Sequence, residues 1–160
     1  MPIGGPMTIK SISLTCALLA TAAFAASPAR ADRCDDLARQ LKSQIDGLSV
    51  GRTAANVIYL AHPAARQLRL GCASRSFSNE IYAAADSRKP APAFAELVAS
   101  AAAIVFTIPK PDTLKGTTRC LSRMGIFRGD DVKLRYRRLD LRCTRSKTSA
   151  NITVSRGKDE

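Results

Sequence analysis

The chain has 160 residues, of which 25 are Lys or Arg and 13 are Asp or Glu, so its formal net charge at pH 7 is +12. This length suits a single domain, and a hydrophobic content of 46% excludes a disordered tail. The chain lacks Trp, contains one His and shows no complete catalytic or metal-binding motif, which disfavours several large enzyme classes.

The first 31 residues have the features of a secretory signal peptide. Lys10 precedes an uncharged, mostly apolar stretch over residues 12–24, and small residues follow it. This stretch is shorter than the roughly 20 residues that span a bilayer. Residues 32–160 are therefore predicted to be one exported domain, periplasmic or secreted from a bacterium, with no transmembrane segment. The start is either Met1 or Met7, and cleavage follows Ala25 or Ala31.

The apolar spacing of residues 32–48 predicts a helix with acidic residues in its first turn. Residues rich in β-branched and apolar types predict strands over 56–60 and 68–72. The alanines in this region leave a single helix over 53–70 as an alternative. A short helix is expected over 77–86.

Residues 94–106 are apolar nearly all round, which predicts a helix in the centre of the domain. Asp112 is the expected N-cap of a further helix that ends near Gly125. Apolar and basic residues then alternate from Val132, which predicts a strand. The apolar residues stand at even positions up to Tyr136 and at odd positions from Leu139, which predicts a bulge or bend near Arg137 and Arg138. A polar loop and residues 152–154 would close a hairpin.

Four cysteines follow the signal segment, and in an exported chain this even number predicts two disulfide bonds. A zinc site is disfavoured because no C-x-x-C pair is present. Two segments resemble each other, since each has an Arg-Cys pair on a predicted helix and then a Leu-x-Leu-x-Cys strand. Of the three possible pairings, this internal similarity favours Cys34 with Cys72 and Cys120 with Cys143.

Together these elements predict an α+β fold. We expect a small two-layer domain, in which helices pack on a short antiparallel sheet with a C-terminal β-hairpin and disulfides tie the layers together.

Acid-base chemistry has one candidate residue. His62 is the only histidine, the side chain used most often for proton transfer at neutral pH. A second acid-base group paired with it is not evident, and no serine lies in a nucleophile motif. The sequence therefore favours a protein that is not an enzyme, with no cofactor and no metal. A small secreted hydrolase or nuclease that uses His62 is the alternative.

The positive charge is concentrated in the C-terminal part. Residues 110–160 have 14 basic and 6 acidic residues, a net charge of +8, whereas residues 32–109 have a net charge of +2. Such a surface attracts an acidic protein or a polyanion. Nucleic acid is the less favoured partner, because aromatic residues for base stacking are scarce. The predicted binding residues are Lys133, Arg135, Arg137, Arg138, Arg142, Arg145 and Lys147.

The segment HPAARQLRLGC at 62–72, together with NEIY at 79–82 and PAPAF at 90–94, resembles small exported proteins of alphaproteobacteria. The resemblance covers most of the chain after residue 31. It implies a location in the cell envelope or outside the cell, and it brings no established activity or functional residue. The leading prediction is an exported binding protein that uses its basic C-terminal hairpin, and a structural component of the envelope is a further alternative.

Overall fold

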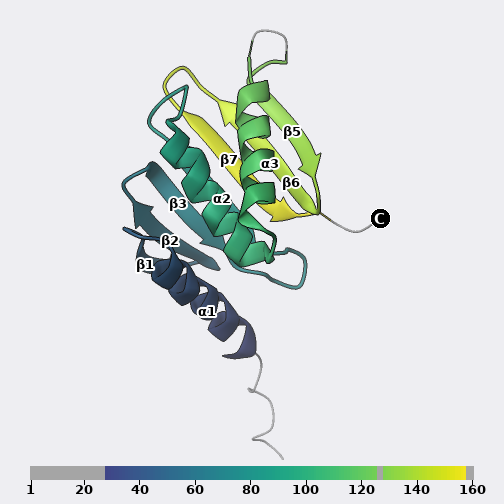
Figure 1. Ribbon diagram of the computed structural model, residues 1–160. Helices are drawn as coiled ribbons and strands as arrows, with labels where there is room; N and C mark the ends of the chain where they lie inside the picture. The colour runs from purple at the N-terminus through teal and green to yellow at the C-terminus, as the bar shows by residue number, and fades with distance from the viewer. Residues whose placement is uncertain (1–27, 126–127, 158–160) are drawn as a thin grey trace, which may run out of the picture.

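The computed structural model describes residues 28–125 and 128–157, so most of the predicted signal peptide lies outside the described residues. Three helices and seven strands make up this part of the chain (Figure 1). The helices are α1 (Pro28–Gln44), α2 (Pro92–Phe106) and α3 (Lys110–Arg123). The strands are β1 (Ser49–Ala54), β2 (Val57–His62), β3 (Ala65–Gly71), β4 (Glu80–Ala85), β5 (Asp131–Tyr136), β6 (Leu139–Arg145) and β7 (Ala150–Arg156).

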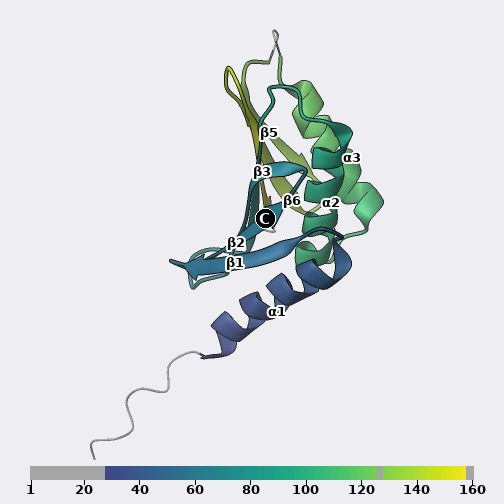
Figure 2. The same cartoon turned by 90° about the vertical axis from the view of Figure 1, so that its left-hand side faces the viewer.

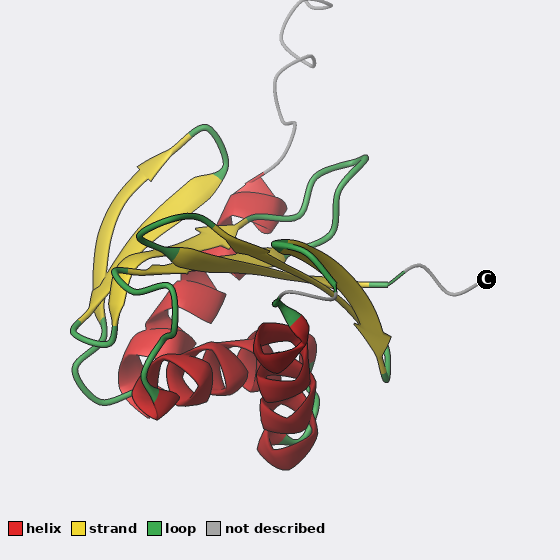
Figure 3. Ribbon diagram, turned by 90° about the horizontal axis from the view of Figure 1, so that it is seen from above, coloured by secondary structure: helices red, strands yellow, loops and turns green. Residues whose placement is uncertain are grey.

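The strands form one antiparallel sheet in the order β1-β2-β3-β4-β7-β6-β5. Strands β1 to β4 form a meander, and helices α2 and α3 follow them in the chain. Strand β5 then lies at the opposite edge of the sheet from β1, and β6 and β7 fill the positions between β5 and β4. Figure 2 shows α2 and α3 on one side of this sheet, and Figure 3 shows the same two helices below a twisted sheet. The predicted α+β class, antiparallel sheet and C-terminal hairpin are confirmed.

The core lies between the sheet and the helices. Alternate strand residues such as Leu70, Ile81 and Ile152 point to the helices and are fully buried, as expected for a sheet with one covered face. The central helix α2 buries Phe94 and Val98 in the same cluster. The predicted central helix over residues 94–106 is therefore confirmed.

Helix α3 lies close to both α2 and β5. The Thr113 hydroxyl is 2.8 Å from the carbonyl oxygen of Ala99, which ties α3 to α2. Gly116 lies against Tyr136 of β5, and a Cβ atom at Gly116 would come within 3.0 Å of the tyrosine ring. The absence of a side chain at Gly116 thus permits the close approach of helix and strand.

Two disulfide bonds tie helices to the sheet. Cys34 of α1 is bonded to Cys72, which follows β3, and Cys120 of α3 is bonded to Cys143 of β6. Both bonds lie on the helix side. The pairing predicted from the internal similarity is confirmed.

The short helix predicted over residues 77–86 is wrong, because residues 80–85 form the central strand β4. Pairing with β3 on one side and β7 on the other satisfies its backbone groups. Its small residues Ala83 and Ala85 are buried on the helix side, so tertiary packing overrides the helix propensity of alanine. The alternative helix over 53–70 is likewise wrong, since β2 and β3 occupy that region.

Several predicted boundaries also change. The N-cap of α3 is Pro109, and Asp112 lies in the first turn, where its carboxylate is 3.6 Å from the Arg137 guanidinium. The predicted bulge at Arg137 and Arg138 is a two-residue turn between β5 and β6, in which Arg137 has a φ of 56°. Helix α1 ends at Gln44, before the predicted residue 48, and β1 was not predicted.

Removal of either disulfide is expected to destabilise the fold. Replacing Cys120 and Cys143 by Ala should lower the free energy of unfolding by about 3 kcal/mol, because the bond closes a chain separation of 23 residues. The Cys34 and Cys72 replacement should cost about 4 kcal/mol, since its separation is 38 residues. Urea denaturation without reductant measures both values. A variant pair as stable as the parent, or a peptide map that joins Cys34 to Cys120, would contradict this assignment.

Candidate functional site

The side chains that point away from the helices form the open face of the sheet, which no described helix covers. Residues directly opposite each other on neighbouring strands share a face. The strand register therefore places a continuous line of side chains across β2, β3, β4, β7, β6 and β5. This cross-strand row consists of Tyr59, Arg69, Tyr82, Thr153, Arg142 and Lys133.

Arginine and tyrosine side chains stack at the β2 to β4 end of the row. The Arg69 guanidinium carbon lies 4.0 Å from the centre of the Tyr82 ring, and that of Arg52 lies 5.0 Å from the Tyr59 ring. Both distances suit a cation–π interaction. No carboxylate of the described residues forms an ion pair with either guanidinium, so both cations remain available to a partner.

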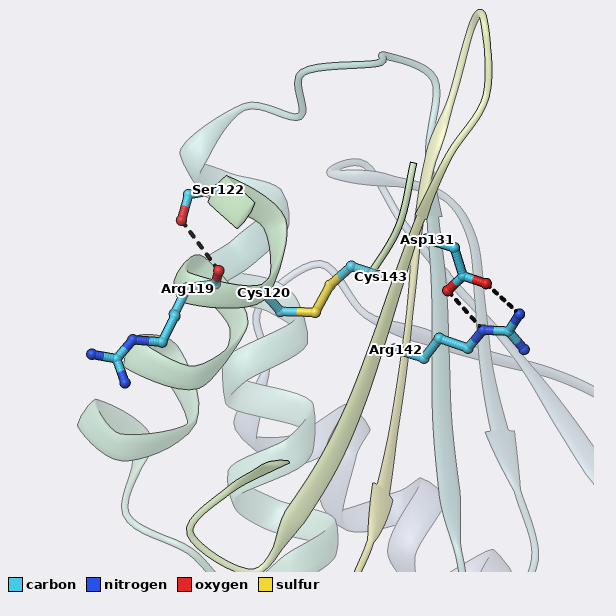
Figure 4. Close-up of a disulfide and its surroundings, with 6 residues drawn as sticks. All are labelled: Arg119, Cys120, Ser122, Asp131, Arg142 and Cys143. Carbon is cyan, nitrogen blue, oxygen red and sulfur yellow. Dashed lines mark hydrogen bonds and ion pairs between the residues drawn. A yellow bond between two sulfur atoms is a disulfide. The ribbon is translucent and has the colours of Figure 1, made fainter. Parts of the chain in front are cut away.

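An ion pair occupies the other end of the row. The Nε and Nη2 atoms of Arg142 donate hydrogen bonds of 3.0 and 2.6 Å to the two carboxylate oxygens of Asp131 (Figure 4). These bonds lower the pKa of the Asp131 carboxyl and raise the pKa of the Arg142 guanidinium. The nearby charge of Lys133 adds to the lowering at Asp131, while Lys133 itself has no ion-pair partner among the described residues.

Of the seven predicted binding residues, Lys133, Arg135 and Arg142 lie on the open face. Arg135 is paired there with Asp140, its Nε being 3.6 Å from the carboxylate. Figure 4 shows that consecutive residues of a strand point to opposite faces of the sheet. Arg142 points to one side of β6, and Cys143 points to the other side, toward α3.

The remaining predicted residues lie elsewhere. Arg145 is on the helix side, where its Nη1 donates a 3.0 Å hydrogen bond to the Met124 carbonyl at the end of α3. Arg137 pairs with Asp112 of α3 from the turn before β6. Arg138 lies in that same turn, whereas Lys147 lies in the turn at the opposite end of β6. The predicted basic residues therefore do not form one surface, because side chains alternate between the two faces along each strand and some of these residues lie in turns.

The open face carries two adjoining hollows. One of about 650 Å³ is bordered by residues of β5, β6 and β7, including Lys133 and Arg142. The other, of about 500 Å³, is bordered by Phe77, whose side chain is 75% exposed. Both hollows border Glu80 and Ser155, so they lie side by side. Aromatic side chains are enriched in the central parts of protein interfaces.

His62 lies at the end of β2, where its ring is engaged with the backbone on both sides. The Nδ1 atom accepts a 3.0 Å hydrogen bond from the Ala64 amide, so Nε2 carries the proton and donates to the Asp46 carbonyl oxygen, also at 3.0 Å. The ring thus joins the loop after α1 to the turn after β2. Both ring nitrogens are therefore engaged with backbone groups.

Two other findings concern the described residues. They contain no group of three or more His, Cys, Asp or Glu side chains that could hold a metal ion. Within the described part of the chain, the helices are also too short or too polar to cross a membrane.

No family model, curated protein or solved structure matches this chain. Its function is therefore inferred from the geometry of the open face.

The sequence did not identify Tyr59, Arg69 and Tyr82 as site residues. Each lies next to a buried residue of its own strand, namely Ile58, Leu70 or Ile81, and therefore points to the opposite face of the sheet. This alternation is visible in the sequence, but the alignment of the three residues depends on the register of β2, β3 and β4.

Replacing Arg142 by Gln is expected to raise the pKa of Asp131 toward its ordinary value of 3.8, because hydrogen bonding to Arg142 is the largest cause of the lowered value. The pKa is lower in the folded state, so the pair stabilises the fold above pH 3.8 and loses this effect as the pH falls through the folded-state value. An NMR titration of the Asp131 carboxyl carbon measures the shift. Lys133→Gln is the control and should give a smaller rise; an unchanged pKa in Arg142→Gln would refute the assignment.

Replacing His62 by Ala is expected to lower the free energy of unfolding by about 1–2 kcal/mol, because two backbone groups lose their partner. Chemical denaturation measures this loss, with Gln67→Ala on the exposed side of β3 as a control that should change little. A role in catalysis makes a different prediction, namely that His62→Ala abolishes hydrolysis of RNA or a phosphoester without changing stability.

Proposed function

We propose that the protein is an exported binding protein that holds an acidic protein partner against the open face of its sheet. The observation that carries this proposal is the cross-strand row, which brings cationic, aromatic and hydroxyl side chains from six strands into one line. The extended, uncovered surface suits a protein partner better than a small substrate.

The charges on this face favour an acidic partner. Its five cations outnumber its three carboxylates within the described residues, and two of those carboxylates are already paired with Arg135 and Arg142. Arg52, Arg69 and Lys133 have no carboxylate partner there. An approaching acidic surface would gain favourable charge contacts along the whole row. The five cations are Arg52, Arg69, Lys133, Arg135 and Arg142, and the three carboxylates are Glu80, Asp131 and Asp140.

The residue types favour a protein over a nucleic acid. Tyrosine and arginine are enriched in the central parts of protein interfaces, where they contribute most of the binding energy. Here the rings of Tyr59 and Tyr82 already stack with arginine side chains, so a base would have to compete with these contacts. The exposed ring of Phe77 adds an apolar contact beside the row.

Export is supported by three features. Two disulfide bonds persist best in an oxidising compartment such as the periplasm or the extracellular space. The first 31 residues have the pattern of a secretory signal, and the segment at 62–72 resembles exported proteins.

The double charge reversal Arg52→Glu and Lys133→Glu tests the open face, because it changes the two ends of the cationic surface and leaves the Asp131–Arg142 pair in place. Binding of poly-L-glutamate, followed by titration calorimetry, is expected to weaken at least tenfold. The matched control is Lys42→Glu with Lys115→Glu, which makes the same change in net charge on exposed positions of α1 and α3. This control should change the affinity much less.

Equal losses in both double variants would show that net charge alone determines binding, and would overturn the open face as the site. If a single-stranded oligothymidylate binds more tightly than polyglutamate, and loses its affinity in the Arg52 and Lys133 variant, the partner of the open face is a nucleic acid and not an acidic protein.

A further inference from the structure

Another hollow, on the helix side of the molecule, has the features of a small-molecule site. It has a volume of about 400 Å³ and lies between the segment before α2, the first turns of α2, and α3. Its lining includes the apolar residues Pro90, Pro92, Ala95, Leu114 and Leu121. A volume of this size is within the usual range of about 300–1,000 Å³ for ligand pockets.

Two cationic side chains line the hollow. Arg145 reaches it from β6, and Lys89 borders it at the rim. Neither has a carboxylate partner among the described residues. The one acidic residue in the lining, Glu96, is neutralised by Lys110, whose Nζ is 3.2 Å from its carboxylate. The net charge of the lining therefore attracts an anion.

Arg145 also has an unmet hydrogen-bonding requirement. Its Nη1 atom donates to the Met124 carbonyl, but its Nε atom is buried and has no acceptor among the described residues. The Arg145 side chain is half-buried and lines the hollow. A guanidinium group is a strong hydrogen-bonding partner for a carboxylate. The apolar lining and this cation together define a ligand with an apolar body and one negative end.

We propose that this hollow binds a small amphipathic carboxylate, with its hydrocarbon body against Leu114 and Leu121 and its carboxylate on Arg145. Lys89 at the rim supplies a second positive charge. This site lies on the opposite side of the sheet from the cross-strand row, so the proposal is independent of the acidic protein partner.

Titration of the full exported protein with decanoate, followed by amide NMR spectra, tests the site. Decanoate below its micelle concentration is expected to bind and to shift the amide signals of Leu114, Leu121 and Arg145. Decanol, which has the same chain without the charge, should bind at least tenfold more weakly. Acetate, which has the charge without the chain, should produce no saturable shift.

Two variants address the two halves of the site. Arg145→Met should weaken decanoate binding at least tenfold and abolish the preference over decanol, whereas Lys42→Met on α1 should change neither. Because Arg145→Met also removes the bond to Met124, Ala95→Leu is a second variant that fills the hollow and keeps the cation; it should weaken decanoate and decanol alike. Equal affinity of the parent for decanoate and decanol would overturn the proposal, as would unchanged binding in Ala95→Leu.

Discussion

The pairing of β4 with β7 joins two meanders into one sheet, and both faces of the molecule depend on its register. On the helix side it sets Ile81 opposite Val154 and Ala83 opposite Ile152, and all four side chains are fully buried. On the open face the same register sets Tyr82 opposite Thr153. A slip of one residue would expose the first set and bury the second. Burial of the core therefore also aligns the two halves of the cross-strand row.

Small side chains bring the central helix close to this junction. Ala83 and Ala85 of β4 are buried on the helix side, and α2 is itself rich in buried alanine, including Ala101 and Ala102. Small side chains at these positions allow the helix and the sheet to approach each other closely. Helix α2 carries no disulfide, whereas α1, on one side of it, is bonded to the residue that follows β3, and α3, on the other side, is bonded to β6. The disulfides thus anchor α1 and α3, and not the central helix α2.

The sequence predicted those elements whose own residues determine their structure. The all-round apolar composition of 94–106 predicted the central helix, and the internal similarity of the two cysteine-containing segments favoured the disulfide pairing that the structure has. Strand β1 escaped prediction because all six of its residues are exposed and its pairing with β2 is made by the backbone. Its one local signal is the turn at Ala55 and Asn56, both with positive φ, in which asparagine is a favoured residue. The cross-strand row could not be predicted, since it is a property of registers between strands far apart in the chain.

The excess of positive charge in the C-terminal part serves the fold as well as the open face. Arg145 donates to the Met124 carbonyl at the end of α3, and Arg156 donates a 2.8 Å hydrogen bond to the Phe106 carbonyl at the end of α2. Both arginines come from the sheet, and both satisfy carbonyl groups at the negative end of a helix. A run of basic residues in the sequence therefore overstates the charge on any one face of the sheet, because alternate positions point to opposite sides of each strand. What remains on the open face is a smaller set of cations, which the strand register aligns with the tyrosines of β2 and β4.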